Sequence, residues 1–268
     1  MVRRPAVAGY FYPKRADELK SLVKGMVDPR ADKEKARAVV SPHAGLIYSG
    51  LVAGAVYSSV ILPEKFVILG PSHRGQRSLF AIMDQGAWRT PLGEVPLDSG
   101  LAESLLRHSA LIEADESAHE EEHSLEVQLP FLQYLKPAFS IVPLCVSPLA
   151  DYGALEKLGT ALAGAVRESG TDVLLVASTD MSHYVSRATA QKKDSLAIER
   201  MRALDARGLY DVVQKEDISM CGFQPTTAVI LAARELGAGR GDLIRYMTSG
   251  ETSGDFNQVV GYAGLRLV

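Results

Sequence analysis

The sequence predicts an α/β protein, a three-layer sandwich in which helices cover both faces of a mixed, mostly parallel central sheet. Two observations support this fold class. Short runs of β-branched and aliphatic residues alternate along the chain with longer segments of helical periodicity. In addition, three of the short runs stop at a turn and are followed by a histidine, namely His43, His73 and His183.

Length and composition narrow the possible classes of protein. The 268 residues include 29 basic and 32 acidic side chains, and 47% are hydrophobic, which is ordinary for a globular protein. This balance of charge gives no indication of a nucleic-acid or membrane partner. No apolar run has the length of a membrane span and the first residues lack the apolar core of a secretory signal, so we expect a cytoplasmic location. No linker or internal repeat is present, and residues 1–268 are expected to form one domain.

Each expected element follows from its own pattern. The strands are apolar runs that end at turn-forming or polar residues, and we expect them at 38–41, 66–70, 141–146, 173–178, 243–248 and 259–267. The helices carry apolar residues on one face, and we expect them at 17–26, 49–57, 99–108, 124–135, 152–168, 188–204, 208–213 and 225–236. Ser49 and Ser124 are expected as N-caps, and Pro130 is expected to kink its helix. A hairpin or meander with its turn near Pro91–Gly93 is also expected, and the mostly parallel sheet is expected to include an antiparallel hairpin or edge.

The strand-end histidines are the strongest functional signal. In open α/β sheets, ligands bind in the crevice outside the carboxyl ends of the strands, so histidines at neighbouring strand ends would meet there. His43 and His73 directly follow their strands. A pair of histidines with one anionic group suits non-haem Fe(II), and the anion could be a carboxylate or a thiolate. The alternative is that each histidine only caps a helix or holds a loop.

The remaining histidines and the two cysteines differ in their surroundings. Cys145 lies inside an apolar strand and is expected to be an inert core residue. Cys221 lies in a loop ahead of a helix, where a functional thiol is more often found. His108 and His119 lie in polar stretches and are expected to be exposed. The acidic run 113–123, which contains His119, has the composition of a solvated face or loop.

Several motifs resemble those of the Memo family, whose prokaryotic members are called AmmeMemoRadiSam system protein B. Six of them follow one another along the chain: Ser41–Gly45, Gly70–His73, Thr90–Gly93, Glu122–Glu126, Ser178–Tyr184 and Met220–Gly222. The likeness begins at Arg4–Gly9 and Phe11–Pro13 and ends near Gly261–Tyr262. It implies a fold similar to the class III, LigB-like extradiol dioxygenases, which open catechol rings with a non-haem iron held by two histidines and a glutamate.

The resemblance also implies a set of metal ligands. These are His43, His73 and Cys221, with the thiolate of Cys221 in place of the glutamate. The implied metal is Fe(II), and Cu and Zn are the alternatives. With two histidines and a metal beside it, Cys221 is expected to have a lowered pKa and to be the reactive thiol.

Further pocket residues are implied by the same resemblance. His123, Asp180 and His183 match catalytic positions and could act as general acid, base and orienting group. Gln128 departs from the family pattern, since many relatives are expected to carry a second histidine there. This departure weakens the case for a proton relay through that helix.

Two functions from different classes are compatible with these residues. The first is an iron-dependent redox enzyme that acts on an unknown small molecule or a modified partner. The second is a non-catalytic metal- or peptide-binding protein, because animal relatives are credited with binding phosphotyrosine-containing peptides. A thiolate is itself oxidised by oxygen chemistry, which weighs against ring opening. The family name further implies a radical-SAM protein and its associated protein as partners.

Overall fold

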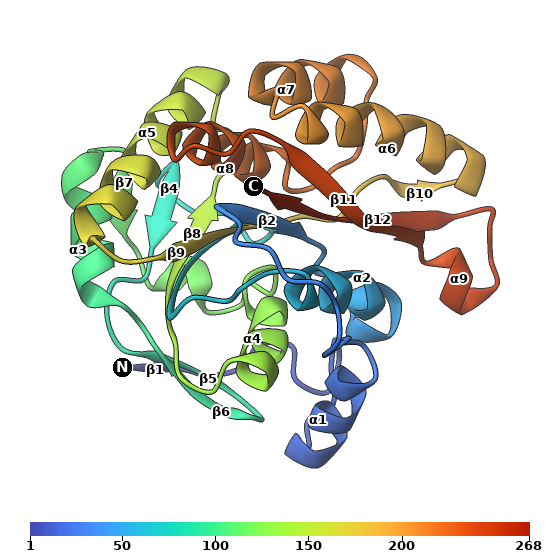
Figure 1. The fold of residues 1–268 in the computed structure, drawn as a ribbon, viewed down its shortest axis with the longest axis horizontal. Helices are drawn as coiled ribbons and strands as arrows, with labels where there is room; N and C mark the ends of the chain where they lie inside the picture. Colours follow the sequence, from blue (N-terminus) through green and yellow to red (C-terminus); the bar gives the residue numbers. More distant parts are fainter.

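A nine-stranded mixed sheet lies between two layers of helices in the computed structural model, which describes residues 1–268 (Figure 1). The strands of this sheet are β2 (Ala38–Ser41), β3 (Lys65–Pro71), β4 (Phe80–Ile82), β7 (Ile112–Ala114), β8 (Ser140–Val146), β9 (Val173–Ser178), β10 (His183–Val185), β11 (Gly241–Thr248) and β12 (Val259–Leu267). A separate three-stranded sheet contains β1 (Val2–Arg3), β5 (Ala87–Thr90) and β6 (Gly93–Pro96). The predicted fold class and the predicted hairpin are both confirmed.

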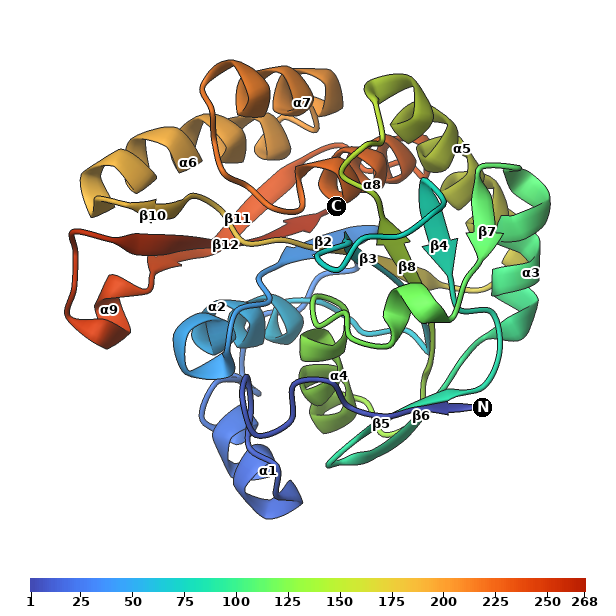
Figure 2. The same cartoon turned by 180° about the vertical axis from the view of Figure 1, so that it is seen from behind.

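The helices divide between the two faces of the large sheet (Figures 1 and 2). One face carries α1 (Ala16–Lys24), α2 (Leu46–Ser58) and α4 (Leu129–Leu135). The opposite face carries α3 (Ser99–His108), α5 (Tyr152–Ser169), α6 (Arg187–Arg202), α7 (Ala206–Lys215) and α8 (Phe223–Glu235). The short helix α9 (Gly250–Ser253) and the 3-10 helices η1 (Ser117–His119) and η2 (Glu126–Gln128) complete the set. None of the helices combines the length and apolarity that crossing a membrane requires.

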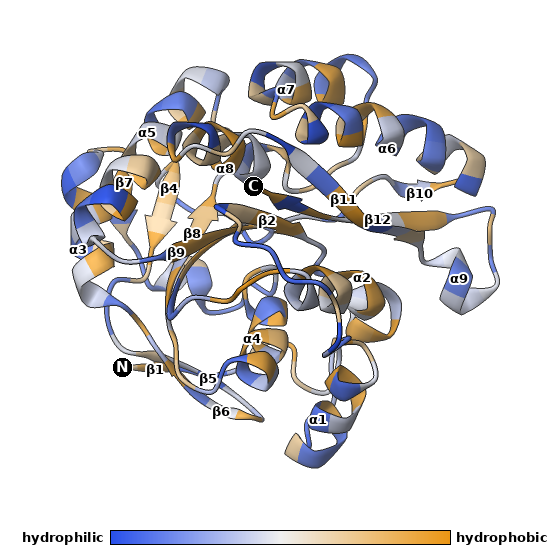
Figure 3. Ribbon diagram, viewed as in Figure 1, coloured by the Kyte–Doolittle hydropathy of each residue, from blue (hydrophilic) through white to orange (hydrophobic).

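The central strands are apolar on both faces, and this explains the two helical layers. Successive side chains of a strand point to opposite faces. In β3, Phe66 and Ile68 pack in the cluster that includes α1, α2 and α4, whereas Val67 and Leu69 pack in the cluster that includes α5 and α8. The middle of the sheet is accordingly hydrophobic throughout (Figure 3). Such strands are stable only when helices cover both sides.

Three histidine-bearing strands are parallel neighbours. The order in the large sheet is β10-β12-β2-β9-β3-β8-β4-β7, and β9 is parallel to both β2 and β3. Their last residues, Ser41, Ser178 and Pro71, therefore lie at one edge of the sheet. The prediction that the three strand ends meet is confirmed, as is the antiparallel pairing of β11 with β12.

Three local predictions are wrong, each because a side chain has a different hydrogen-bond partner or position. Ser49 lies inside α2, and its hydroxyl donates to the carbonyl of Ala44 at 2.8 Å instead of capping the helix. The hydroxyl of Ser124 donates to the carbonyl of Pro71 at 3.2 Å. Pro130 lies in the first turn of α4, where its missing N–H removes no helical hydrogen bond and no kink results.

We expect the chain to unfold in one cooperative transition, because the two apolar clusters share the strands of one sheet. Losing either layer of helices would expose the apolar face of the strands that this layer covers, and the sheet would then be unstable as a whole. Urea unfolding should be followed by the fluorescence of Trp88, the single tryptophan, and by far-ultraviolet circular dichroism. Two transitions at different urea concentrations would contradict the prediction that residues 1–268 form one domain.

Candidate metal centre

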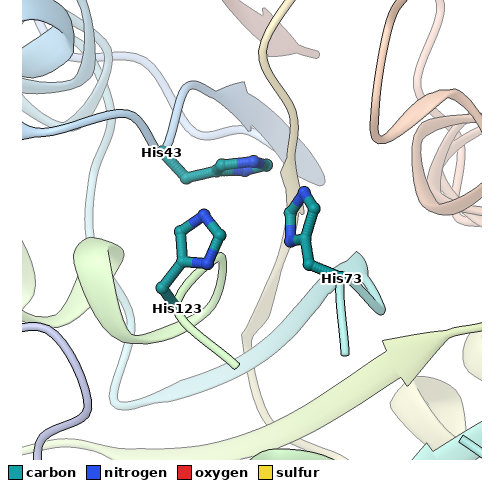
Figure 4. A group of neighbouring side chains, drawn as sticks. All are labelled: His43, His73 and His123. Carbon is teal, nitrogen blue, oxygen red and sulfur yellow. The ribbon is translucent and has the colours of Figure 1, made fainter. Parts of the chain in front are cut away.

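Three histidine rings meet at the carboxyl edge of the sheet (Figure 4). His43 follows β2, His73 follows β3, and His123 lies between η1 and η2. One ring nitrogen of each residue lies within 4.8 Å of those of the other two. The ring centroids of His43 and His73 are 5.3 Å apart, and those of His73 and His123 are 4.5 Å apart. This three-histidine group could hold a metal ion.

Burial keeps two of these imidazoles neutral. His43 is 2% exposed, and burial, reinforced by His123 and His73, lowers its pKa well below the usual value. Burial also lowers the pKa of His123 to about 4, although the carboxylate of Glu122 opposes this shift. A metal binds only the unprotonated imidazole nitrogen. Both rings are therefore in the form that a metal requires at neutral pH.

The hydroxyl of Ser178 determines which nitrogen of His43 carries the proton. Its single hydrogen is donated to the carbonyl of Ser124 at 2.6 Å, and its oxygen accepts from the amide of Gln128 at 2.8 Å. The 2.9 Å contact with Nδ1 of His43 must then be one in which the ring donates. Because the neutral ring has one proton, Nε2 of His43 keeps a free lone pair.

Glu122 has the same role for His73. Its buried carboxylate lies 2.9 Å from Nδ1 of His73 and accepts the backbone N–H groups of His73 at 2.6 Å and of Ser124 at 2.8 Å. Burial alone would raise the pKa of Glu122, but the hydrogen bonds and charge of His73 outweigh it and hold that pKa at about 2. An ionised carboxylate only accepts hydrogen bonds, so Nδ1 of His73 donates to it, and in the neutral ring the lone pair is on Nε2.

The prediction of a solvated acidic run at 113–123 is wrong for Glu122 and His119, which are both 0% exposed. The ring nitrogen Nδ1 of His119 lies 3.4 Å from Sγ of Cys145, below the ring of Trp88. Cys145 is buried as predicted, and burial raises its pKa. Sequence reasoning missed Glu122, and its position directly before His123 was the one available signal.

Cys221 adjoins the three-histidine group from the loop before α8. Its Sγ lies 3.3 Å from Nε2 of His43 and accepts the backbone N–H of Asp180 at 3.2 Å. The loop approaches closely because residue 222 is glycine; a Cβ there would lie 2.4 Å from the carbonyl oxygen of Ser178. Burial, with the nearby carboxylate of Asp180, raises the pKa of Cys221. Both effects oppose the thiolate, and the lowering of the pKa that is expected beside a bound metal stays a prediction.

Asp180 and His183 lie beside the three-histidine group but outside it. Oδ1 of Asp180 accepts the backbone N–H of His43 at 2.8 Å, and burial raises the pKa of Asp180 to about 6. Nδ1 of His183 donates to the carbonyl of Ser219 at 2.8 Å. Gln128 is buried behind His43 and, as an amide, cannot carry protons as a histidine could. The catalytic roles of His123, Asp180 and His183 stay predictions.

The chain matches a known family over nearly its whole length. The family model described as Memo-like protein matches residues 3–266. The chain belongs to the Memo family. It is 43% identical to a MEMO1 family protein of Methanopyrus kandleri, with 99% of this chain and 98% of that protein covered. A MEMO1 family protein of Methanothermobacter thermautotrophicus is 41% identical, with 99% and 100% covered.

The relationship also extends to a solved structure, at the level of the fold. An uncharacterized protein from Escherichia coli K12 superposes with a TM-score of 0.58 and 15% sequence identity, covering 85% of this chain and 99% of that one. The Memo family resemblance seen in the sequence motifs is thus confirmed. In this Memo family member, the structure brings His43, His73 and His123 together, and Sγ of Cys221 lies 3.3 Å from Nε2 of His43.

Acidification should destabilise the protein through its buried histidines. Burial lowers the pKa of His119 and of His123 to about 4, whereas an unfolded histidine has a pKa of about 6.5. Between these values the unfolded chain binds more protons, so the free energy of unfolding falls as the pH falls, by about 1.4 kcal/mol per pH unit for each histidine. Urea unfolding across this range should show a slope that is smaller in His119→Gln. An unchanged slope would contradict a neutral, buried His119.

Proposed function

We propose that this protein binds one divalent transition-metal ion through His43, His73 and Cys221 and that the loaded protein is a redox enzyme. One observation carries the metal site. Nδ1 of His43 already donates a hydrogen bond to Ser178, and Nδ1 of His73 donates one to Glu122. In each neutral ring this leaves the lone pair of Nε2 free. Metal-binding histidines are typically held in this way, with the second nitrogen fixing the tautomer and the orientation of the ring.

Ring orientation argues against His73 and His123 binding one ion together, and Cys221 is the alternative third ligand beside His43. A metal lies close to the plane of the imidazole that binds it, because the lone pair lies in that plane. The rings of His73 and His123 are stacked at 25°, so their planes do not meet near both nitrogens. The rings of His43 and His73 are at 79°. The 3.3 Å between Sγ of Cys221 and Nε2 of His43 suits two atoms on one ion, for which metal–ligand lengths of about 2.1 and 2.3 Å give about 3.1–3.6 Å.

The donor set suits Fe(II), Cu or Zn, and we propose Fe(II) as the first candidate. Two imidazoles and one anionic ligand resemble the sets that hold non-haem iron with positions left open. When bound, such an ion supplies open coordination positions and a redox-active centre. Of the surrounding residues, neutral His123 can accept a proton from a bound molecule, and Asp180 holds the backbone of His43 through its N–H group.

Titration of Fe(II) under anaerobic conditions tests the ligand set. His43→Ala and Cys221→Ser should abolish binding, whereas His123→Ala should weaken it by about 10- to 100-fold. His108→Ala, a change of an exposed histidine on α3 that is not part of the group, serves as the control and should bind as the parent does. If His123→Ala abolished binding and Cys221→Ser did not, the three-histidine group would hold the metal instead. Repeating the titration with Cu and Zn ranks the metals.

Oxygen consumption tests the redox activity separately. The Fe(II)-loaded protein should consume oxygen in the presence of catechols or of a cell extract, and Cys221→Ser mixed with the same amount of Fe(II) should not. A protein that binds iron but consumes no oxygen with any of these would fit the second class, a non-catalytic binding protein. That class in turn predicts binding of phosphotyrosine peptides, which fluorescence anisotropy can measure.

A further inference from the structure

We infer that Arg3 is a positioning residue for the metal site, acting through the loop 119–126 that carries Glu122 and His123. The inference rests on the proposed function for its effect on metal binding. Its effect on the ring of His73 is independent of any metal. Arg3 lies on β1, in the three-stranded sheet beside the main one, and contacts none of the proposed ligands.

The guanidinium of Arg3 joins three points of the loop. Nε donates to the carbonyl of His119 at 2.8 Å, and Nη2 donates to the carbonyl of Glu122 at 2.7 Å. Nη1 forms an ion pair with the carboxylate of Glu126. Arg3 is 6% exposed, and its guanidinium carbon lies 4.1 Å from the ring centroid of Trp88. One planar group therefore spans the loop from end to end.

Glu126 attaches the rest of the N-terminal segment to the same loop. Its carboxylate accepts the backbone N–H groups of Ala6 at 2.8 Å and Val7 at 3.2 Å and also the hydroxyl of Tyr12. The ring of Phe11 lies 4.8 Å from that of His123. The N-terminal segment and the loop are thus one hydrogen-bonded unit, with Arg3 at its centre.

Only a guanidinium can make these contacts together. Residues 120–125 lie outside any helix or strand, and the carbonyl of Glu122 accepts from Arg3, whereas the carbonyls of His123 and Leu125 accept nearby backbone N–H groups. Arginine offers donors in a planar fork, whereas lysine has a single nitrogen that cannot reach the three acceptors. Without the fork, the backbone of Glu122 loses an anchor, and its carboxylate no longer stays fixed against Nδ1 of His73. The proton of His73 would then be shared between its two nitrogens.

Nitrogen-15 NMR of the imidazole rings in the metal-free chain tests this first step. When its ring is neutral, His73 of the parent should be one tautomer with the proton on Nδ1, and Arg3→Ala should show averaged shifts from both tautomers. Arg3→Lys should behave like Arg3→Ala. Millimolar methylguanidinium should restore the parent shifts in Arg3→Ala, and methylammonium should not. Arg15→Ala, which removes an exposed arginine, is the matched control and should match the parent.

The Fe(II) titration supplies the second step. Arg3→Ala should bind iron about 10- to 100-fold more weakly than the parent and regain affinity with methylguanidinium. Parent-like His73 shifts in a folded Arg3→Ala or Arg3→Lys protein would overturn the inference. A different result is that Arg3→Ala shows averaged His73 shifts but the parent binds no metal. That result would overturn the proposed function and leave the positioning role of Arg3 standing. If Arg3→Ala does not fold, the imidazole nitrogen shifts of His73 in Arg3→Lys provide the same test.

Discussion

The ionised carboxylate of Glu122 is the constraint on which the site depends. A buried charge is unfavourable unless donors surround it, and here the donors are two backbone N–H groups and the ring of His73. The contacts that satisfy the charge of Glu122 are therefore the same contacts that orient the ring of His73. The low pKa of Glu122 and the defined tautomer of His73 both follow from these contacts.

His43 is oriented by neutral groups. Ser178, at the end of β9, binds the ring and is itself bound by Gln128, whose amide oxygen accepts the hydroxyl of Tyr57 at 2.8 Å. The single hydrogen of Ser178 is donated to the carbonyl of Ser124 and the amide nitrogen of Gln128 can only donate, so the direction of every bond is determined. One strand-end histidine is therefore held by a charge and the other by a neutral network. This difference leaves the two rings in unlike electrostatic surroundings.

The parts of the molecule that could be predicted from the sequence are those that depend on residues close together along the chain. Apolar runs such as Phe66–Leu69 specify buried strands, and the parallel order of β2, β9 and β3 then brings His43 and His73 to one edge. The contacts that orient the rings could not be predicted in this way. Arg3 and Glu122 are separated by 119 residues, and no local pattern records that they meet. The burial of His119 and the raised pKa of Cys221 likewise arise from residues packed around them after folding.

The position of Arg3 has a consequence for the order of events during synthesis. The arginine leaves the ribosome well before Glu126, which follows 123 residues later. Until then the guanidinium has no native partner, and the loop that holds His73 has no anchor. Contacts that close such long segments of chain are slow to form compared with local ones. The partners of β2 and β3, which are β8, β9 and β12, also follow Glu126 in the chain, so the strand edge and the defined histidine tautomers both form at a late stage of folding.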